Sequence, residues 1–268
     1  MELVIGAALC GIVVGILSGL LGVGGGSMMV PIFRLGFGLS ALASTGTSLF
    51  AMIFTAAAGS ITHVRNHTCL VPLGLIAGVC GACTSPLGVR LANMSPAWLV
   101  MLATGGVIAY SASTMLRKGL AMPKDGSVVA ATKAAEPAFL TPQDLTRRHY
   151  IIGAIAGLAA GVAGGYVGLG GGFLMVPIFV AGAGLPMKQT SGTSLFAVGI
   201  LATTGAITQA VYGNVEVLAG LAMAAGSIPG AIVGANYIRR IPERTLRLMF
   251  GAFLLFISVL LVVNEILF

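Results

Sequence analysis

Charge is scarce in this sequence. Of its 268 residues only 8% are Asp, Glu, Lys or Arg, whereas 57% are hydrophobic, and the mean hydropathy is +1.03. A soluble domain carries about a quarter charged residues. Because so few charges cannot cover a water-exposed surface, the composition excludes a soluble globular protein. It predicts that a lipid bilayer surrounds most of the chain.

Acidic residues are scarcer still, and each lies in an expected loop or at the edge of an apolar run. The seven are Glu2, Asp125, Glu136, Asp144, Glu216, Glu243 and Glu265. Cation and proton pathways usually keep ionisable groups inside the membrane. The lack of acids within the apolar runs argues against a sodium or metal transporter and fits an anion held by neutral donors.

Cysteine occurs only four times, in a pattern that does not predict a disulfide framework. Cys80 and Cys83 form a C-x-x-C pair, which can belong to a redox or zinc site. Such a site needs further ligands nearby, and no histidine lies beside the pair. His63 and His67 are expected to face a polar loop and are assigned no role. Cysteine in an apolar run usually packs as a small hydrophobic residue, so we expect no metal and no other cofactor.

Long apolar runs are what the sequence has in abundance. A helix needs about 20 residues to cross the hydrocarbon core of a membrane. Eight runs approach or reach that length: Leu3–Leu21, Ala41–Val64, Leu70–Leu91, Trp98–Leu116, Tyr150–Val167, Lys188–Tyr212, Val215–Tyr237 and Leu246–Leu267. They predict an all-α, polytopic integral membrane protein.

Basic residues give the chain a formal net charge of +7, but they gather between apolar runs. The clusters are Arg117, Lys118, Lys124, Lys133, Arg147 and Arg148 in the centre, and Arg239, Arg240, Arg244 and Arg247 near the C-terminus. Short basic loops between spans follow the positive-inside rule, which places them in the cytoplasm. The charge therefore predicts a multi-pass protein of an inner (plasma) membrane and argues against nucleic-acid binding.

An internal repeat begins at the first glycine-rich stretch. Gly15–Phe33 matches Gly161–Phe179, and both contain a Gly-x-Gly-Gly-Gly run followed by Met-Val-Pro-Ile-Phe. The offset is 146 residues, the separation of Pro31 and Pro177. Identity at a fixed offset over this length indicates duplication of a whole unit.

A second motif continues the repeat at the same offset. Thr45–Phe50 matches Ser191–Phe196, and both end in Gly-Thr-Ser-Leu-Phe. The sequence therefore predicts a first membrane repeat at 1–116, a polar basic loop at 117–149 and a second membrane repeat at 150–268. Each repeat is expected to hold four long transmembrane helices and one short glycine-flanked helix.

The basic clusters also predict the relative orientation of the repeats. With four crossings per half, the two clusters would lie on opposite sides of the membrane. If the short segments also cross, each half has five crossings, the repeats are inverted, and both clusters share the cytoplasmic side with Arg65. Arg90 then lies on the other side. We expect inverted repeats.

The short segments Ser27–Phe37 and Phe173–Ala183 follow the glycine runs at matching positions. Paired short, glycine-interrupted segments are the best sequence pointer to the substrate site of a transporter built from repeats. A helix that resumes after a glycine run presents unpaired N–H groups and the positive end of its dipole, which suits an anion. We therefore predict an anion site near the bilayer midplane, where the two runs meet.

Hydroxyl residues accompany both glycine runs, although Ser and Thr also serve close helix packing in membranes. The predicted substrate-binding residues are Gly24, Gly25, Gly26, Thr47, Ser48, Gly170, Gly171, Gly172, Thr193 and Ser194. Arg34 and Lys188 flank the short segments and can attract an anion, or extend to the headgroup region instead. Pro31 and Pro177 are predicted as structural helix breaks.

The doubled pattern resembles the TauE/SafE family of membrane permeases. It consists of Gly22-x-Gly-Gly-Gly26 with Val30-Pro31, then Gly-Thr-Ser-Leu-Phe, repeated in the second half. The resemblance covers nearly the whole chain outside the central loop. It implies a bacterial or archaeal inner-membrane transporter, of a family with members assigned to export of sulfite, sulfoacetate and other organosulfonates.

The expected function is therefore transport of a small anion, with no enzymatic activity, since no nucleophile stands beside a base. Two other functions stay open. One is a passive channel for small neutral solutes. The other is a membrane scaffold that does not transport and docks a partner through its central loop.

Overall fold

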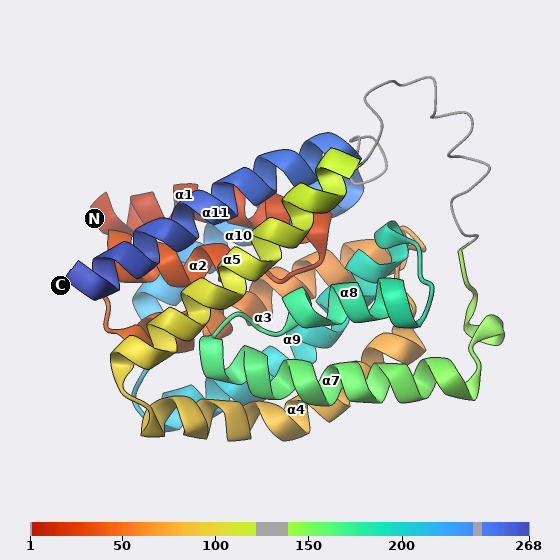
Figure 1. The fold of residues 1–268 in the computed structure, drawn as a ribbon, viewed down its shortest axis with the longest axis horizontal. Coiled ribbons are helices and arrows are strands. Elements are labelled where there is room, and N and C mark those ends of the chain that lie inside the picture. The colour runs from red at the N-terminus through yellow and green to blue at the C-terminus, as the bar shows by residue number, and fades with distance from the viewer. Residues whose placement is uncertain (1, 122–138, 238–242, 268) are drawn as a thin grey trace.

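The computed structural model describes residues 2–121, 139–237 and 243–267, and every regular element within these ranges is helical (Figure 1). The helices are α1 (Glu2–Leu21), α2 (Gly26–Pro31), α3 (Ala41–Arg65), α4 (Val71–Met94), α5 (Ala97–Ala121), α7 (Arg147–Val167), α8 (Gly172–Gly182), α9 (Met187–Val211), α10 (Val217–Tyr237) and α11 (Glu243–Leu267), with a π-helical segment η1 (Ile32–Gly36) and a 3-10 turn η2 (Pro142–Asp144). Of the predicted basic clusters, Lys124, Lys133, Arg239 and Arg240 lie outside the described residues.

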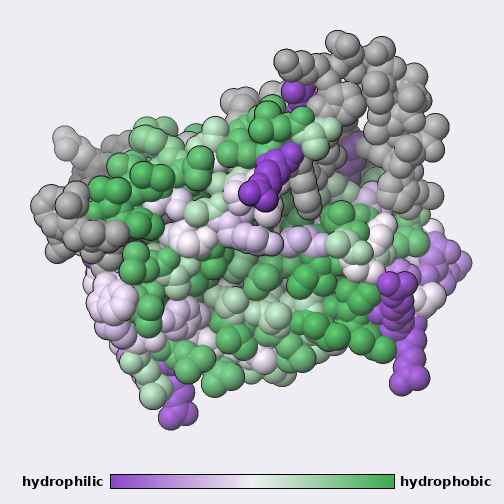
Figure 2. Space-filling model, in the orientation of Figure 1, coloured by the Kyte–Doolittle hydropathy of each residue, from purple (hydrophilic) through white to green (hydrophobic). Residues whose placement is uncertain are grey.

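Six of these helices are long and apolar enough to cross a membrane, judged by length and composition: α3, α4, α5, α7, α9 and α10. Each of the eight predicted runs corresponds to one helix and extends beyond it by at most two residues, but the apolar stretches Gly6–Leu21 of α1 and Leu254–Val263 of α11 are shorter. Figure 2 shows a broad hydrophobic surface that carries few strongly hydrophilic residues. The chain is a multi-pass membrane protein.

The helices pack in pairs that cross between the two halves of the chain. α1 lies along α10, α4 lies along α7, and α5 pairs with α11, while α3 and α9 contact each other and several of the remaining helices. The spacing is regular: α3 and α9 are both 25 residues long and begin at Ala41 and Met187. α5 and α11 also have 25 residues each and begin at Ala97 and Glu243. Both separations equal the offset of the sequence repeat.

Glycine stripes allow the closest helix pairs to form. A Cβ on Gly15 of α1 would collide with the backbone oxygen of Ser227 on α10. Gly161, at the equivalent position of α7, would collide with the backbone oxygen of Gly81 on α4. Small residues spaced four apart let membrane helices approach to backbone contact. These glycines therefore determine how the two halves pack together.

Helix directions follow from Figure 1. α1 and α7 run in opposite directions along the long axis, as do α5 and α11. The chain termini lie at one end, whereas the C-terminal end of α5 and the N-terminal ends of α7 and α11 lie at the other. The short helices α2 and α8 each turn back toward the end at which α1 and α7 began.

Candidate functional site

The glycine runs interrupt the helices by adopting left-handed backbone conformations. φ is +70° at Gly22, +87° at Gly24 and +82° at Gly25. The second run repeats this geometry, with φ between +70° and +73° at Gly168, Gly170 and Gly171. Only glycine adopts these angles without steric cost. The predicted interruptions are thus present, and they lie at the glycines rather than at the prolines.

Pro31 and Pro177, both predicted as helix breaks, differ in their effect on the helix. α8 continues through Pro177 to Gly182. Pro31 is the last residue of α2, and the π-helical η1 follows it directly. Proline lacks the N–H that an α-helix uses at this position, but this is equally true of Pro177, so the proline alone does not explain the change of helical register after Pro31.

The two interrupted segments contact each other in the interior of the protein. A Cβ on Gly26 would lie 2.7 Å from the Leu169 Cα, and one on Gly172 would lie 2.8 Å from the Val23 oxygen. Every residue of the stretches 20–31 and 167–172 is buried. The side chain of Met52, on α3, lies against both segments. The sequence predicts that the two runs meet, and in the structure they are in contact.

Both short helices begin at this contact without a side-chain cap. α2 begins after Gly25 and α8 begins after Gly171, and neither N-cap residue supplies a side-chain hydrogen bond. The first N–H groups of a helix have no partner within it, and the dipole adds positive potential there. Two positive helix ends therefore meet in an apolar environment.

The hydroxyl motifs of α3 and α9 join the two halves. Thr47 Oγ1 accepts a hydrogen bond from the Glu216 N–H at 3.0 Å, and Thr193 Oγ1 accepts one from the Leu70 N–H at 2.9 Å. Each threonine thus fixes the start of a helix from the opposite half, α10 or α4. These two hydroxyls stand at equivalent positions of the repeat.

The serines of the same motifs lie closer to the glycine segments. Ser194 Oγ donates to the Gly22 carbonyl at 2.7 Å and so holds the first interrupted segment directly. Ser48 Oγ points to the Met52 sulfur at 3.8 Å. All four motif hydroxyl residues are fully buried.

The flanking cations occupy different elements. Arg34 lies in η1, where its Nη1 donates to the Leu39 carbonyl at 3.1 Å. Lys188 lies in the first turn of α9, directly after the loop that follows α8. Both are partly buried, and both make further interactions within the protein.

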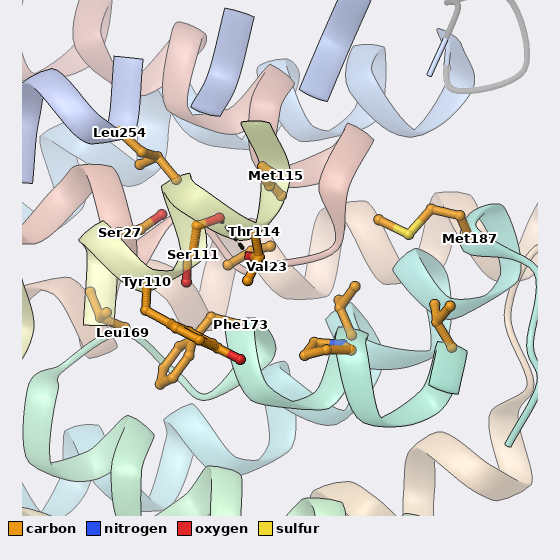
Figure 3. Close-up of a pocket in the computed structure, with 13 residues that line it drawn as sticks. Val23, Ser27, Tyr110, Ser111, Thr114, Met115, Leu169, Phe173, Met187 and Leu254 are labelled. Atoms are coloured by element: carbon orange, nitrogen blue, oxygen red, sulfur yellow. Dashed lines mark hydrogen bonds between the residues drawn. The ribbon is translucent and has the colours of Figure 1, made fainter. Parts of the chain in front are cut away.

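A cavity of about 210 Å³ lies beside the glycine segments, between α5 and α8 (Figure 3). Its lining residues are Val23, Ser27, Tyr110, Ser111, Thr114, Met115, Leu169, Phe173, Val176, Pro177, Val180, Met187 and Leu254. The cavity touches both interrupted segments, through Val23 and Ser27 of the first and Leu169 of the second. Its hydroxyls come from α2 and α5, whereas α8 contributes only apolar side chains. No lining residue is charged.

Sequence reasoning missed the contribution of α5. Tyr110, Ser111 and Thr114 lie outside both repeated motifs, so no pattern singled them out. Ser27 did carry a signal, because the repeat replaces it by Phe173 at the equivalent position. Because Ser27 is polar and Phe173 is aromatic, the two halves of the site differ chemically at this position. Of the predicted residues, only Pro177 belongs to the cavity wall itself.

The expectation that His63 faces a polar loop was wrong. Its side chain is completely buried, because α3 packs it against the end of α1. Nε2 lies 2.8 Å from the Gly19 carbonyl and Nδ1 lies 2.8 Å from Thr68 Oγ1. Gln209, its counterpart in the second half, is also buried and donates to Thr45 Oγ1 at 3.3 Å.

The cysteines and other potential metal ligands stay apart. Within the described ranges, no three His, Cys, Asp or Glu side chains are close enough to hold a metal ion. Cys83 is exposed and Cys80 is half-buried, both as free thiols. Burial raises the pKa of the Cys69 thiol to about 12, an effect that a hydrogen bond from Thr193 partly opposes.

The chain matches a known family along nearly its whole length. The family model described as "Sulfite exporter TauE/SafE" covers residues 7–261. Probable membrane transporter protein YdhB of Bacillus subtilis is 27% identical over 234 residues, which is 87% of this chain and 89% of that protein. YunE of the same organism is 27% identical over 266 residues, covering 92% and 93% of the two chains. A probable membrane transporter protein of Haemophilus influenzae is 26% identical over 280 residues, covering 94% and 95%.

No solved structure matches this chain. The family description and the names of the relatives nonetheless agree with the long apolar helices of this chain. The chain belongs to the TauE/SafE family of membrane transporter proteins.

Proposed function

We propose that the protein moves a small anion, such as sulfite, sulfoacetate or a related organosulfonate, outward across the plasma (inner) membrane. The family description names sulfite, and the relatives are described as membrane transporters rather than enzymes. The observation that carries the anion assignment is the buried contact between the two glycine-interrupted segments. It brings two uncapped helix N-termini together where the surroundings are apolar and their potential is least screened.

The proposed binding residues divide into two groups. Backbone N–H groups of Gly24, Gly25 and Gly26, with those of Gly170, Gly171 and Gly172, would face the anion. Thr47, Ser48, Thr193 and Ser194 would hold the first glycine segment and the surrounding helices in place, since three of their four hydroxyls bond to backbone of the opposite half. Arg34 and Lys188 would raise the local anion concentration near the ends of the short helices.

The proposed architecture is two inverted repeats, 1–116 and 150–268, joined by a cytoplasmic loop at 117–149. Equal element spacing and the opposite directions of α1 and α7 support it. Arg147 and Arg148 begin α7 at the same end of the molecule as the start of α11. By the positive-inside rule that end is cytoplasmic. Rocking of one repeat against the other would then alternate access to the shared site.

Flux into proteoliposomes tests the proposal. Purified protein in sealed vesicles should produce saturable movement of sulfite or sulfoacetate that empty vesicles do not show. Cation flux without anion flux would contradict the proposal. Flux of neutral solutes without saturation would instead support a passive channel.

The scaffold alternative is tested separately. Deletion of 126–135, a segment outside the described residues, should leave anion flux intact in a transporter. A scaffold would lose its partner instead, with no flux present before or after the deletion.

A further inference from the structure

The cavity makes the two halves of the site unequal. It opens between α5 and α8, whereas the equivalent pair, α11 and α2, is packed together. Pro177 of α8 is half-buried at the cavity wall, but its counterpart Pro31 is fully buried. The glycine segments therefore adjoin a cavity between α5 and α8, whereas the equivalent space between α11 and α2 is closed.

Ser27 lies where the cavity reaches the first glycine segment. The residue is only 3% exposed, it lines the cavity, and its hydroxyl has no hydrogen-bond partner among the described residues (Figure 3). Buried hydroxyls in native proteins are almost always hydrogen-bonded, so an unpaired one calls for a specific explanation. A ligand in the cavity would provide the missing acceptor.

The opposite wall has a different chemistry. Phe173, at the repeat position equivalent to Ser27, lines the cavity together with Val176 and Val180 of α8. These side chains offer no hydrogen bond. At about 210 Å³ the cavity lies below the roughly 300 Å³ at which pockets for drug-sized ligands begin. It has room for more than a bare four-atom oxyanion.

We infer that Ser27 is a substrate-binding residue and that the substrate is a small amphipathic anion, whose oxyanion head accepts a hydrogen bond from Ser27 Oγ while its apolar substituent lies along Phe173 and Val176. This inference rests on the proposed transport function and specifies it. An organic sulfonate has both parts, since its charge is confined to one end. Inorganic sulfite has only the head and leaves the apolar wall uncovered.

Ser18 offers a matched control for Ser27. It is 2% exposed, also lacks a hydrogen-bond partner among the described residues, and packs behind Gly25 of the same segment. It does not line the cavity. Ser27→Ala and Ser18→Ala therefore remove the same atoms from similarly buried positions, but only the first removes a group that faces the cavity.

The experiment measures saturable flux of sulfite, methanesulfonate and propanesulfonate in proteoliposomes for the native chain and both variants. The native chain should have a lower KM for propanesulfonate than for sulfite. Ser27→Ala should raise the KM for every anion roughly ten- to hundred-fold, the effect of losing a hydrogen bond to a charged group. Ser18→Ala should change it less than about twofold.

A second variant addresses the apolar wall. Phe173→Ser should raise the KM for propanesulfonate and leave that for sulfite nearly unchanged, whereas a merely structural role would shift both. Equal effects of the two serine variants, or a native preference for sulfite that Phe173→Ser does not alter, would overturn the inference. If the native chain moves no anion at all, the proposed function itself fails. Ser27→Cys, which keeps the volume and weakens the hydrogen bond, replaces Ser27→Ala should the latter not fold.

Discussion

At the scale of single residues, His63 links three parts of the chain that the sequence separates. Its ring joins the end of α1, through the Gly19 carbonyl, to the loop after α3, through Thr68. Gly192, of the α9 hydroxyl motif, packs directly against the His63 side chain. The imidazole therefore joins the end of α1, the loop after α3 and helix α9, and its second-half counterpart is the neutral amide of Gln209.

His63→Leu should destabilise the protein by about 1–3 kcal/mol, because the buried Gly19 carbonyl and Thr68 hydroxyl lose a partner. His63→Gln should cost less, since Gln209 occupies the equivalent position in the other half. Thermal unfolding in detergent measures both variants. Equal Tm values for His63→Leu and the native chain would show that these hydrogen bonds contribute nothing.

Cys69 is expected to be unreactive in the folded protein. Its pKa of about 12 keeps the thiol protonated at neutral pH, and the thiolate is the reactive form. In a variant without the other three cysteines, maleimide should label Cys69 slowly in the folded protein and quickly once the protein is unfolded. Equal labelling rates in the two states would contradict the burial of Cys69.

The raised pKa of Cys69 also makes the stability of the protein depend on pH. The folded pKa exceeds the ordinary value of 9.0, so the folded state retains the proton more strongly than the unfolded chain does. This contribution is fully present below about pH 9 and is lost as the pH rises toward 12. Cys69→Ser should therefore lose less Tm than the native chain between about pH 9 and pH 12. The same dependence of Tm on pH in both proteins would contradict the raised pKa of Cys69.

At the scale of elements, the helix pairs α1–α10 and α4–α7 pack closely because glycines line their contacts. A side chain at Gly161 would meet backbone, which cannot rotate away, so Gly161→Val should separate α7 from α4. Overpacking of this kind costs about 1–3 kcal/mol or more. Gly106→Ala is the control, because nothing lies within 4 Å of its added Cβ. Detergent Tm should fall for the first variant and stay unchanged for the second.

The helices themselves could be predicted well, and the reason is the bilayer. An apolar run in lipid has to satisfy its backbone internally, so each run predicts one helix. The predicted segment Phe173–Ala183 corresponds to α8 to within one residue. The segment Ser27–Phe37 corresponds to α2 and η1 together, and the change to π-helix after Pro31 could not be predicted from composition.

The site was predicted only in part. A run of glycines is visible in the sequence and indicates positive φ, so both interrupted segments could be predicted. The partners of Thr47 and Thr193 could not, because each lies more than 120 residues away in the chain. The contribution of α5 to the cavity is likewise a matter of tertiary packing, and it leaves no motif.

At the scale of the whole molecule, the proposed inverted topology fixes which residues share a side of the membrane. Arg65 ends α3 and Val211 ends α9, at equivalent positions of the two repeats. In a cysteine-free background, Arg65→Cys should react with a membrane-impermeant maleimide only from the cytoplasmic side, and Val211→Cys only from outside. Both positions are exposed, so burial would not mask the labelling. Reaction of both from one side would contradict inverted repeats.

The central claim is that an anion binds where the two glycine segments meet. Selenite has the shape and charge of sulfite, and its selenium atom can be located by anomalous diffraction from crystals of the complete chain. The account predicts an anomalous peak in the cavity beside Ser27, next to the contact between the two glycine segments. Peaks confined to surface arginines and lysines, with the cavity occupied by none, would contradict it.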